Sequence, residues 1–337
     1  MLDSVDIKKM NTDRIRLALW SGDRYTKLSM ASETGLSVAT CNTVLNKLIE
    51  SGEVKGEKRQ LNGIGRSSMV FSLNENFETI LCIRFDLYSD NKRIVNIDAI
   101  SMLGNSLKSQ TYFYDTLSVE QIGNHIQEFM DIFDNISLIL VGSNGIISNG
   151  HLRMSDIPEI EGIDIEQELT RYCRNIPLHV KYDCQFMAYG AYHHSNNYNN
   201  SASTVTLMHC IKNVIPGTAS VVDGKIIHGK NGFAGMTGYM YRKLNHPHIN
   251  KNIASGDSNV IARTIVSIIT VLNPNIFIFA GNIITKKDIN IIREECAKYL
   301  PIDFLPEFRV AEDDGTQYYL EGMYHMAIDI KNFAVPK

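Results

Sequence analysis

Two stretches of the sequence carry side chains in patterns that could do chemistry. The first, "SVATCNTVLNKLIES", puts hydroxyl and amide groups on one side of a predicted helix, where they can hydrogen-bond the edges of DNA bases. The second, "GKNGFAGMTGYM", has glycine at every third position, which suits close approach of a backbone to a ligand. It closes with Met236, Thr237 and Tyr239, which neither titrate near pH 7 nor form a usual set of metal ligands.

The first stretch is predicted to be a helix over residues 38–51, capped by Ser37 and stopped by Gly52. Its apolar side chains recur at three- and four-residue spacing, so they should bury one face. The opposite face presents short polar groups and one lysine, which can reach a phosphate. We expect the DNA contacts of this helix to be Ser37, Thr40, Asn42, Thr43, Asn46 and Lys47.

The elements around this helix predict a winged helix–turn–helix domain. A helix is expected over 12–20, and a short one from Thr26 to Gly35 precedes the three-residue turn. After the third helix, alternating stretches on either side of "NGIG" predict a basic hairpin, with Arg66 as a further DNA contact. The alternative is a small helical domain whose hairpin binds a protein partner.

Charge is unevenly distributed along the chain. Residues 1–75 contain 11 Lys/Arg and 9 Asp/Glu, a net charge of +2, whereas the remainder has 22 against 28, a net charge of −6. A slightly basic head on an acidic body is consistent with a DNA-reading domain. There is no apolar run of membrane-spanning length and no leader-type apolar segment, so we expect a soluble cytoplasmic protein without a membrane partner.

The six cysteines occur without a C-x-x-C pair. This spacing indicates neither a zinc site nor a disulfide framework, and reduced, mostly buried thiols are expected.

From residue 77 the pattern changes to strands alternating with helices. Three strands, a helix, a strand and a helix occur approximately twice, which predicts two related lobes with a cleft between them. The strands are expected over 79–87, 93–100, 107–114, 136–142, 178–182, 204–210, 217–224, 225–229 and 275–281. The helices are expected over 118–133, 164–175, from about 185, 258–272, 285–300 and 315–330. The expected domains are 1–76, then 77–195 completed by helix 315–330, and 196–314.

These stretches resemble the ROK family of repressors, open reading frames and sugar kinases, in its repressor branch. "LSVATCNTVLNKLIESGEV" is similar to the family's DNA-reading segment, and "GIGRSSMVFSLN" to its wing. "GTASVVDGKIIHGKNGFAGMTGYM" is similar to its glycine-rich signature, and "LNPNIFIFAGNI" to the segment before its nucleotide-side loop. The resemblance covers nearly the whole chain. It implies an α/β fold in which a winged helix–turn–helix precedes a two-lobed, actin-like (ribonuclease H-like) body of the sugar-kinase type, usually a homodimer or tetramer.

The resemblance fails at the positions where the family binds ATP. Family kinases have a phosphate loop of Asp, a variable residue, two glycines, Thr and Lys. The matching "DLYSDNK" keeps Asp86 but has Tyr88 and Ser89 in place of the glycines, and Asp90 adds repulsion of phosphate. The second phosphate loop, "IPGTAS", is also poorer in glycine. ATP is therefore not expected as a cofactor.

The sugar-binding positions are partly kept. In "YDC", Asp183 stands at the position of the family's general base, and Tyr182 replaces an asparagine. Asp183 either accepts hydrogen bonds from a ligand hydroxyl or caps a helix. The turn "GSNG" matches a sugar-contacting loop. The resemblance implies as effector-binding residues Asn144, Gly145, Asp156, Asp183 and Met236.

The glycine-rich stretch departs from the family where the family holds its zinc. Met236 stands where the family has a sugar-binding Glu, and Tyr239 where it has a zinc-binding His. The following segment contains His246 and His248 but no cysteine, so no zinc and no other metal is expected.

The sequence therefore predicts a DNA-binding transcriptional regulator, a repressor of carbohydrate-related genes that binds a double-stranded operator. Its catalytically inactive body would sense a sugar or sugar-derivative effector and form the dimer. Two alternatives are a sugar kinase that uses ATP and an interaction scaffold without an effector.

Overall fold

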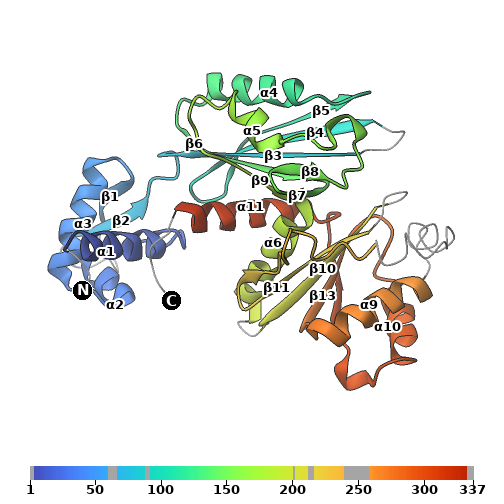
Figure 1. Ribbon diagram of the computed structural model, residues 1–337. Coiled ribbons are helices and arrows are strands. Elements are labelled where there is room, and N and C mark those ends of the chain that lie inside the picture. The colour runs from blue at the N-terminus through green and yellow to red at the C-terminus, as the bar shows by residue number, and fades with distance from the viewer. Residues whose placement is uncertain are drawn as a thin grey trace.

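A computed structural model describes residues 4–59, 67–87, 92–199, 202–211, 216–238 and 258–331. Figure 1 shows a small N-terminal head beside a body of two lobes, each built on its own β-sheet.

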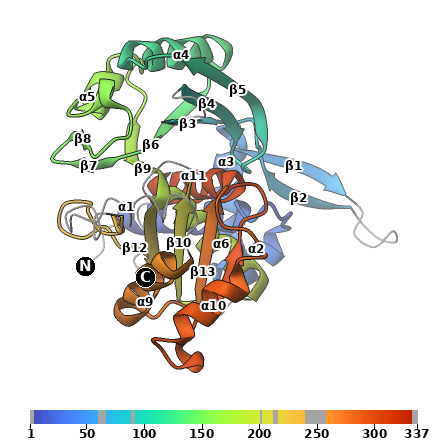
Figure 2. The same ribbon diagram turned by 90° about the vertical axis from the view of Figure 1, so that its right-hand side faces the viewer.

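The head consists of three helices and a two-stranded antiparallel ribbon. Its elements are α1 (Ser4–Leu19), α2 (Lys27–Thr34), α3 (Val38–Glu50), β1 (Val54–Arg59) and β2 (Ser68–Leu73). Thr26 caps α2 and Ser37 caps α3, each through a hydroxyl that accepts a backbone N–H. Figure 2 shows the β1–β2 ribbon projecting from the head in the manner of a wing. The α1 helix begins well before residue 12. Its first turns are exposed and lysine-rich, and their apolar side chains Val5 and Ile7 do not join the core that marks the rest of the helix.

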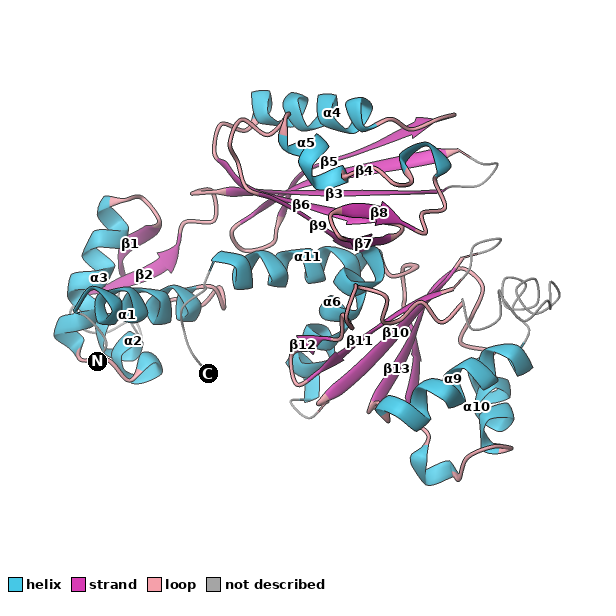
Figure 3. Cartoon of the chain, in the orientation of Figure 1, coloured by secondary structure: helices cyan, strands magenta, loops and turns pink. Residues whose placement is uncertain are grey.

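The first lobe contains a mixed five-stranded sheet. Its first three strands along the chain pair antiparallel to one another, and the remaining two strands are added in parallel at one edge. Its order is β5 (Ser106–Tyr114), β4 (Arg93–Ser101), β3 (Thr79–Leu87), β6 (Ile136–Ser143) and β9 (Leu178–Tyr182). Helices α4 (Val119–Ile132) and α5 (Ile165–Thr170) cover its outer face (Figure 3). The α5 helix ends at Thr170, earlier than predicted, and Arg174 and Asn175 adopt positive φ angles in the turn before β9.

The second lobe repeats this arrangement. Its sheet has the order β12 (Lys225–Ile226), β11 (Gly217–Val222), β10 (Thr204–Cys210), β13 (Ile276–Gly281) and β14 (Glu307–Val310). Helices α9 (Ser258–Leu272) and α10 (Ile289–Ala297) pack on its outer face.

Several short elements were not predicted. They are the hairpin β7 (Ile146–Ser148) and β8 (His151–Arg153), the strand β14, and the 3₁₀ turns η2 (Pro158–Ile160) and η3 (Ile302–Phe304). The short hairpin and the 3₁₀ turns contain too few residues to show a hydrophobic period.

Two helices, α6 (Asp183–Asn199) and α11 (Thr316–Lys331), lie between the two sheets. The α6 helix packs on β10 and β11, and α11 packs on α6 and contacts β3 and β6. Their backbones meet at two glycines. A Cβ atom added to Gly190 would lie 1.9 Å from the Tyr318 carbonyl oxygen, and one added to Gly322 would lie 1.8 Å from the Phe186 oxygen. The crossing therefore excludes any side chain at both positions.

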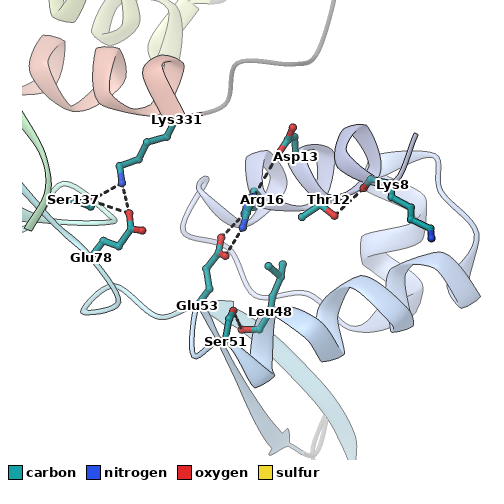
Figure 4. A network of polar contacts seen from close by, with 10 residues as sticks. All are labelled: Lys8, Thr12, Asp13, Arg16, Leu48, Ser51, Glu53, Glu78, Ser137 and Lys331. Carbon is teal, nitrogen blue, oxygen red and sulfur yellow. Dashed lines mark hydrogen bonds and ion pairs between the residues drawn. The ribbon is translucent and has the colours of Figure 1, made fainter. Parts of the chain in front are cut away.

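The far end of α11 reaches the head. Ile328 packs against the hydrophobic core of the head, together with Met102 from the turn between β4 and β5. The Tyr324 hydroxyl donates to the Met102 carbonyl at 3.3 Å. At the end of α11, Lys331 donates to Glu78 and to Ser137 of the first lobe (Figure 4). The head is thus held by side chains from two elements of the body.

All six cysteines are buried and free, as the sequence predicted for most of them. In the part of the chain that the structure describes, no helix combines the length and apolar character needed to cross a membrane.

We predict that Gly322→Ala lowers the free energy of unfolding by about 2–3 kcal/mol, because the added methyl group forces α6 and α11 apart. By helix propensity alone, replacing glycine with alanine would raise the free energy of unfolding by about 1 kcal/mol. A decrease in the free energy of unfolding would therefore indicate that the added methyl group does not fit at the crossing. Urea denaturation measures it, with Gln317→Ala, on the exposed side of α11, as the control. Unchanged or increased stability of Gly322→Ala would show that the crossing can relax.

Candidate functional site

The exposed face of α3 is polar and unobstructed by other described elements of the head. Ser37, Thr43, Asn46 and Lys47 are exposed, and Thr40 and Asn42 are half-buried. All three hydroxyls, of Ser37, Thr40 and Thr43, already take part in local hydrogen bonds, and the Ser37 and Thr40 hydroxyls lie 2.8 Å apart. Ser37 Oγ accepts the Thr40 N–H at 3.1 Å, and Thr43 Oγ1 donates to the Ala39 carbonyl at 3.1 Å. Arg66 lies outside the described residues.

A buried ion pair fixes α3 and the wing relative to α1. Arg16 donates from Nε and Nη2 to the two carboxylate oxygens of Glu53, at 2.7 and 2.8 Å, and lies 3.5 Å from Asp13 (Figure 4). Glu53 and Asp13 are each 4% exposed. The hydrogen bonds to Glu53 raise the pKa of Arg16. This bidentate geometry joins α1 to the turn between α3 and β1, and so sets the orientation of the exposed face of α3.

A polar cavity of about 280 Å³ lies between the two lobes. The first lobe contributes Asp86 from the end of β3, Asn144 after β6, and the segment 154–156. The second lobe contributes His209 and Gly217, and the start of α6 contributes Asp183 and Cys184. The cavity is also lined by Glu161, Tyr182 and Met236. No Lys or Arg is among the described residues that line it.

On the side of the cavity formed by the first lobe, two segments of the chain cross. One contains Asn144 and Gly145, the other runs from Arg153 to Glu161, and hydrogen bonds hold them in place. Ser155 Oγ donates to Asn144 Oδ1 at 2.8 Å. The Glu161 carboxylate accepts the backbone N–H groups of Met154 and Ser155, at 3.1 and 2.8 Å. Gly145 lies beneath this segment, since a Cβ there would be 2.6 Å from the Arg153 carbonyl oxygen. Gly145 therefore allows the two segments to cross.

Three carboxylates converge on the cavity. Burial, together with the charges of Asp86 and Asp156, raises the pKa of Asp183. Burial and the charge of Asp156 likewise raise the pKa of Asp86, although the Leu87 backbone N–H and the Asn144 amide oppose this shift. The Asp183 carboxylate accepts the Cys184 N–H at 2.5 Å at the start of α6. Asp183 thus makes a hydrogen bond at the start of α6 and also lines the cavity. Its role in accepting a ligand hydroxyl stays a prediction.

Tyr182 occupies the space between β9 and the first residue of β11. A Cβ added to Gly217 would lie 1.9 Å from the Tyr182 hydroxyl and 2.9 Å from Cys184 Sγ. Gly217 is the glycine that the family resemblance placed in the second phosphate loop. Here its lack of a side chain makes room for a buried tyrosine.

The glycine-rich stretch bends against the start of β11. Gly235 has a φ of +94°, and its carbonyl accepts both the Thr218 backbone N–H at 2.9 Å and the Thr218 hydroxyl at 2.8 Å. Its bend places the neighbouring Met236 side chain at the cavity. The glycine spacing therefore maintains a turn beside the cavity. Tyr239, His246 and His248 lie outside the described residues.

The structure brings four of the five predicted effector-binding residues, Asn144, Asp156, Asp183 and Met236, to one cavity, and Gly145 adjoins it. The sequence did not single out Cys184, His209 or Glu161, which also line it. His209 ends a buried strand, and burial lowers its pKa to about 4. No local pattern marks these residues, because their position depends on packing between separate lobes.

Together, the head and body define a class: a two-lobed α/β protein of actin-like fold that carries an N-terminal helix–turn–helix and a polar cavity between its lobes. The sequence model of the ROK family matches residues 93–255, so this part of the chain is a ROK family domain.

Solved structures show the same fold at low sequence identity. One is a ROK family transcriptional regulator, described as a homologue of the E. coli Mlc protein. It is 13% identical with a TM-score of 0.70, and the match covers 97% of this chain and 99% of that one. A putative sugar kinase from Cytophaga hutchinsonii is 15% identical with a TM-score of 0.57, covering 74% and 99%. The ROK hexokinase from Thermus thermophilus is 11% identical with a TM-score of 0.54, covering 75% and 99%. A comparison with curated protein sequences gave no significant match.

We predict that Arg16→Met destabilises the chain by about 2 kcal/mol, because it leaves the buried Glu53 and Asp13 carboxylates without their cation. This value is below that of a fully buried pair, since the Arg16 side chain is 35% exposed. The matched control is Arg59→Met, which removes an arginine whose pair with Glu57 is exposed. Thermal unfolding of both variants measures the difference, and equal losses would exclude a special role for the buried pair.

Proposed function

We propose that this protein is a DNA-binding transcriptional regulator, a repressor of carbohydrate-related genes, whose body senses a small effector between its lobes and has no kinase activity. The observation that carries the proposal is the position of α11. One end of this helix contacts the first lobe beside the cavity, and its other end packs against the winged helix–turn–helix head.

The extent of the structural matches supports a regulator. The regulator structure aligns with 97% of the chain, whereas the two sugar kinases described above align with 74% and 75%. A kinase has no need of a polar recognition helix and a projecting ribbon, but these are the parts by which a winged helix reads DNA. The regulator would act in the cytoplasm, and as a two-fold dimer it would present two heads to a pseudo-palindromic operator.

Tyr182 supports loss of kinase activity. Its hydroxyl faces Gly217, where the family's second phosphate loop must approach ATP with its backbone exposed. A coupled assay of ATP hydrolysis with a panel of hexoses tests this part of the proposal. Turnover above that of the protein without sugar would favour the sugar kinase instead.

The charge of the cavity supports a proposal for the chemical class of effector. Asp86, Asp156 and Asp183 supply hydrogen-bond acceptors for hydroxyl groups, and no described lining residue supplies a cation for a phosphate. We therefore expect an unphosphorylated sugar or sugar derivative to bind better than its phosphate ester.

The geometry also provides a route from the cavity to the head. Tyr319 of α11 lies against Gly142 of β6, where an added Cβ would be 1.4 Å from its hydroxyl oxygen. Arg84 of β3 donates to Thr316 at 3.3 Å and lies over the Tyr319 ring. Closure of the lobes around an effector would therefore shift α11, and with it the contact between Ile328 and the head. The effector changes DNA affinity only to the extent that it binds the two arrangements differently.

We predict that Asn46→Ala relaxes base preference at one operator position by about 1–3 kcal/mol, because an exposed amide on α3 can read a base edge. Lys47→Ala should instead weaken binding to all sequences and reduce the salt slope by about 1, as loss of a phosphate contact does. Operators selected from random-sequence DNA and fluorescence anisotropy at two salt concentrations provide the measurement.

The control for these variants is Lys298→Ala, which removes an exposed lysine of the second lobe, just beyond α10. It should change neither quantity. If no sequence is enriched and binding to random DNA is independent of salt, the interaction scaffold is the better description.

We predict that Asp156→Asn reduces effector-induced release of DNA at least about tenfold in effector concentration, because a ligand hydroxyl loses a charged acceptor. Affinity for DNA without effector should stay the same. The probes are neutral hexoses, amino sugars and their phosphates, titrated against the preformed protein–DNA complex. The control is Asp303→Asn, an exposed carboxylate in η3. An unaltered response of Asp156→Asn would exclude this cavity as the effector site.

A further inference from the structure

The cavity contains a set of side chains that neither DNA binding nor recognition of sugar hydroxyls requires. Asp183 and Cys184 begin α6, and His209 lies near the end of β10. One ligand atom from each of the three lies within 4.8 Å of the others. They combine a carboxylate oxygen, a thiol sulfur and an imidazole nitrogen, which are the three donor types that zinc accepts in proteins.

We propose that Asp183, Cys184 and His209 form a binding site for a divalent transition metal of the zinc type, with its fourth position open to the cavity between the lobes. The proposal departs from the sequence prediction of no zinc and no other metal. That prediction considered the glycine-rich stretch and the segment after it, whereas this site lies in the cavity.

The spacing of the three donors is compatible with a metal site. Bond lengths of about 2.0–2.3 Å place the donors of tetrahedral zinc roughly 3.3–3.8 Å apart. The three donor atoms here all lie within 4.8 Å of one another, so changes in their separations of about 1 Å or less would reach that range. Asp183 and Cys184 are adjacent at the start of one helix, and His209 comes from the neighbouring strand.

The surrounding charges favour a cation. Asp86 and Asp156 line the same cavity, and no described lining residue is a lysine or arginine. A divalent ion would neutralise this excess of carboxylate. A neutral imidazole is the form of histidine that binds metal. The metal would displace the proton of the Cys184 thiol to solvent, since only the thiolate is a ligand.

The donor set also selects among metals. A thiolate and an imidazole favour Zn²⁺ or Co²⁺ over Mg²⁺ and Ca²⁺, which prefer oxygen ligands. The open position faces the cavity, so it would be filled by water or by an oxygen of a bound ligand, as in zinc sites that retain an exchangeable position.

The test is titration of the full chain with Co²⁺, which reports a thiolate ligand by a sulfur-to-cobalt charge-transfer band and tetrahedral geometry by intense visible bands. We expect about one ion per chain, displaced by Zn²⁺ and unaffected by excess Mg²⁺. Cys184→Ser should abolish the charge-transfer band. The matched control is Cys173→Ser, another buried free cysteine that is outside the cavity and should retain the band.

A second variant keeps the test decisive if Cys184→Ser does not fold. His209→Ala, at a partly buried position, should weaken Co²⁺ binding at least about tenfold. Absence of the band in the unaltered protein, its persistence in Cys184→Ser, or unchanged affinity in His209→Ala would overturn the proposal. Because the readout involves no DNA, a protein that binds Co²⁺ but no operator would retain this site and refute the proposed regulator.

Discussion

The close crossing of α6 and α11 is the constraint on which the rest of the structure depends. Gly190 and Gly322 let the two backbones touch, and any side chain at either position would overlap a carbonyl oxygen of the other helix. Close packing converts a small gain in volume at such a point into displacement of whole elements. This pair of helices lies between the sheets of both lobes, so its geometry sets the relation between them.

Each end of the crossing serves a different part of the protein. The start of α6 supplies Asp183 and Cys184 to the cavity, whereas the end of α11 supplies Ile328 to the core of the head. A rigid pair of helices can transmit a change at one end to the other because the packed arrangement does not deform continuously. The α6 and α11 helices therefore connect the cavity between the lobes to the head, and the proposed regulation uses this connection.

The cavity combines close backbone packing with a varied set of polar side chains. Gly145, Gly217 and Gly235 allow segments to approach closely, and they accommodate a crossing loop, a buried tyrosine and a turn against Thr218. Three carboxylates line the cavity, together with a thiol and an imidazole. A fold is retained by packing, whereas its ligand is decided by a few side chains, so the two can change independently.

The sequence by itself determined the features that depend on neighbours along the chain. The cap at Ser37, the buried face of α3 and the alternation of strands and helices were all predicted, because each arises from local hydrogen bonds and periodic burial. This alternation also predicted the two lobes, and the family resemblance added four of the residues that line the cavity, Asn144, Asp156, Asp183 and Met236. Boundaries of short or polar helices were less well predicted, since no apolar period marks them.

Only the tertiary structure decided how distant residues meet. Nothing near Tyr182 in the sequence indicates that its hydroxyl packs against Gly217, and nothing near Cys184 indicates that His209 lies beside it. In the sequence, Gly190 and Gly322 would each be expected to weaken a helix. Only the structure shows that both are needed where the two helices cross. Contacts of this kind join elements far apart in the chain, and their distances follow from the packing of whole lobes rather than from any local preference.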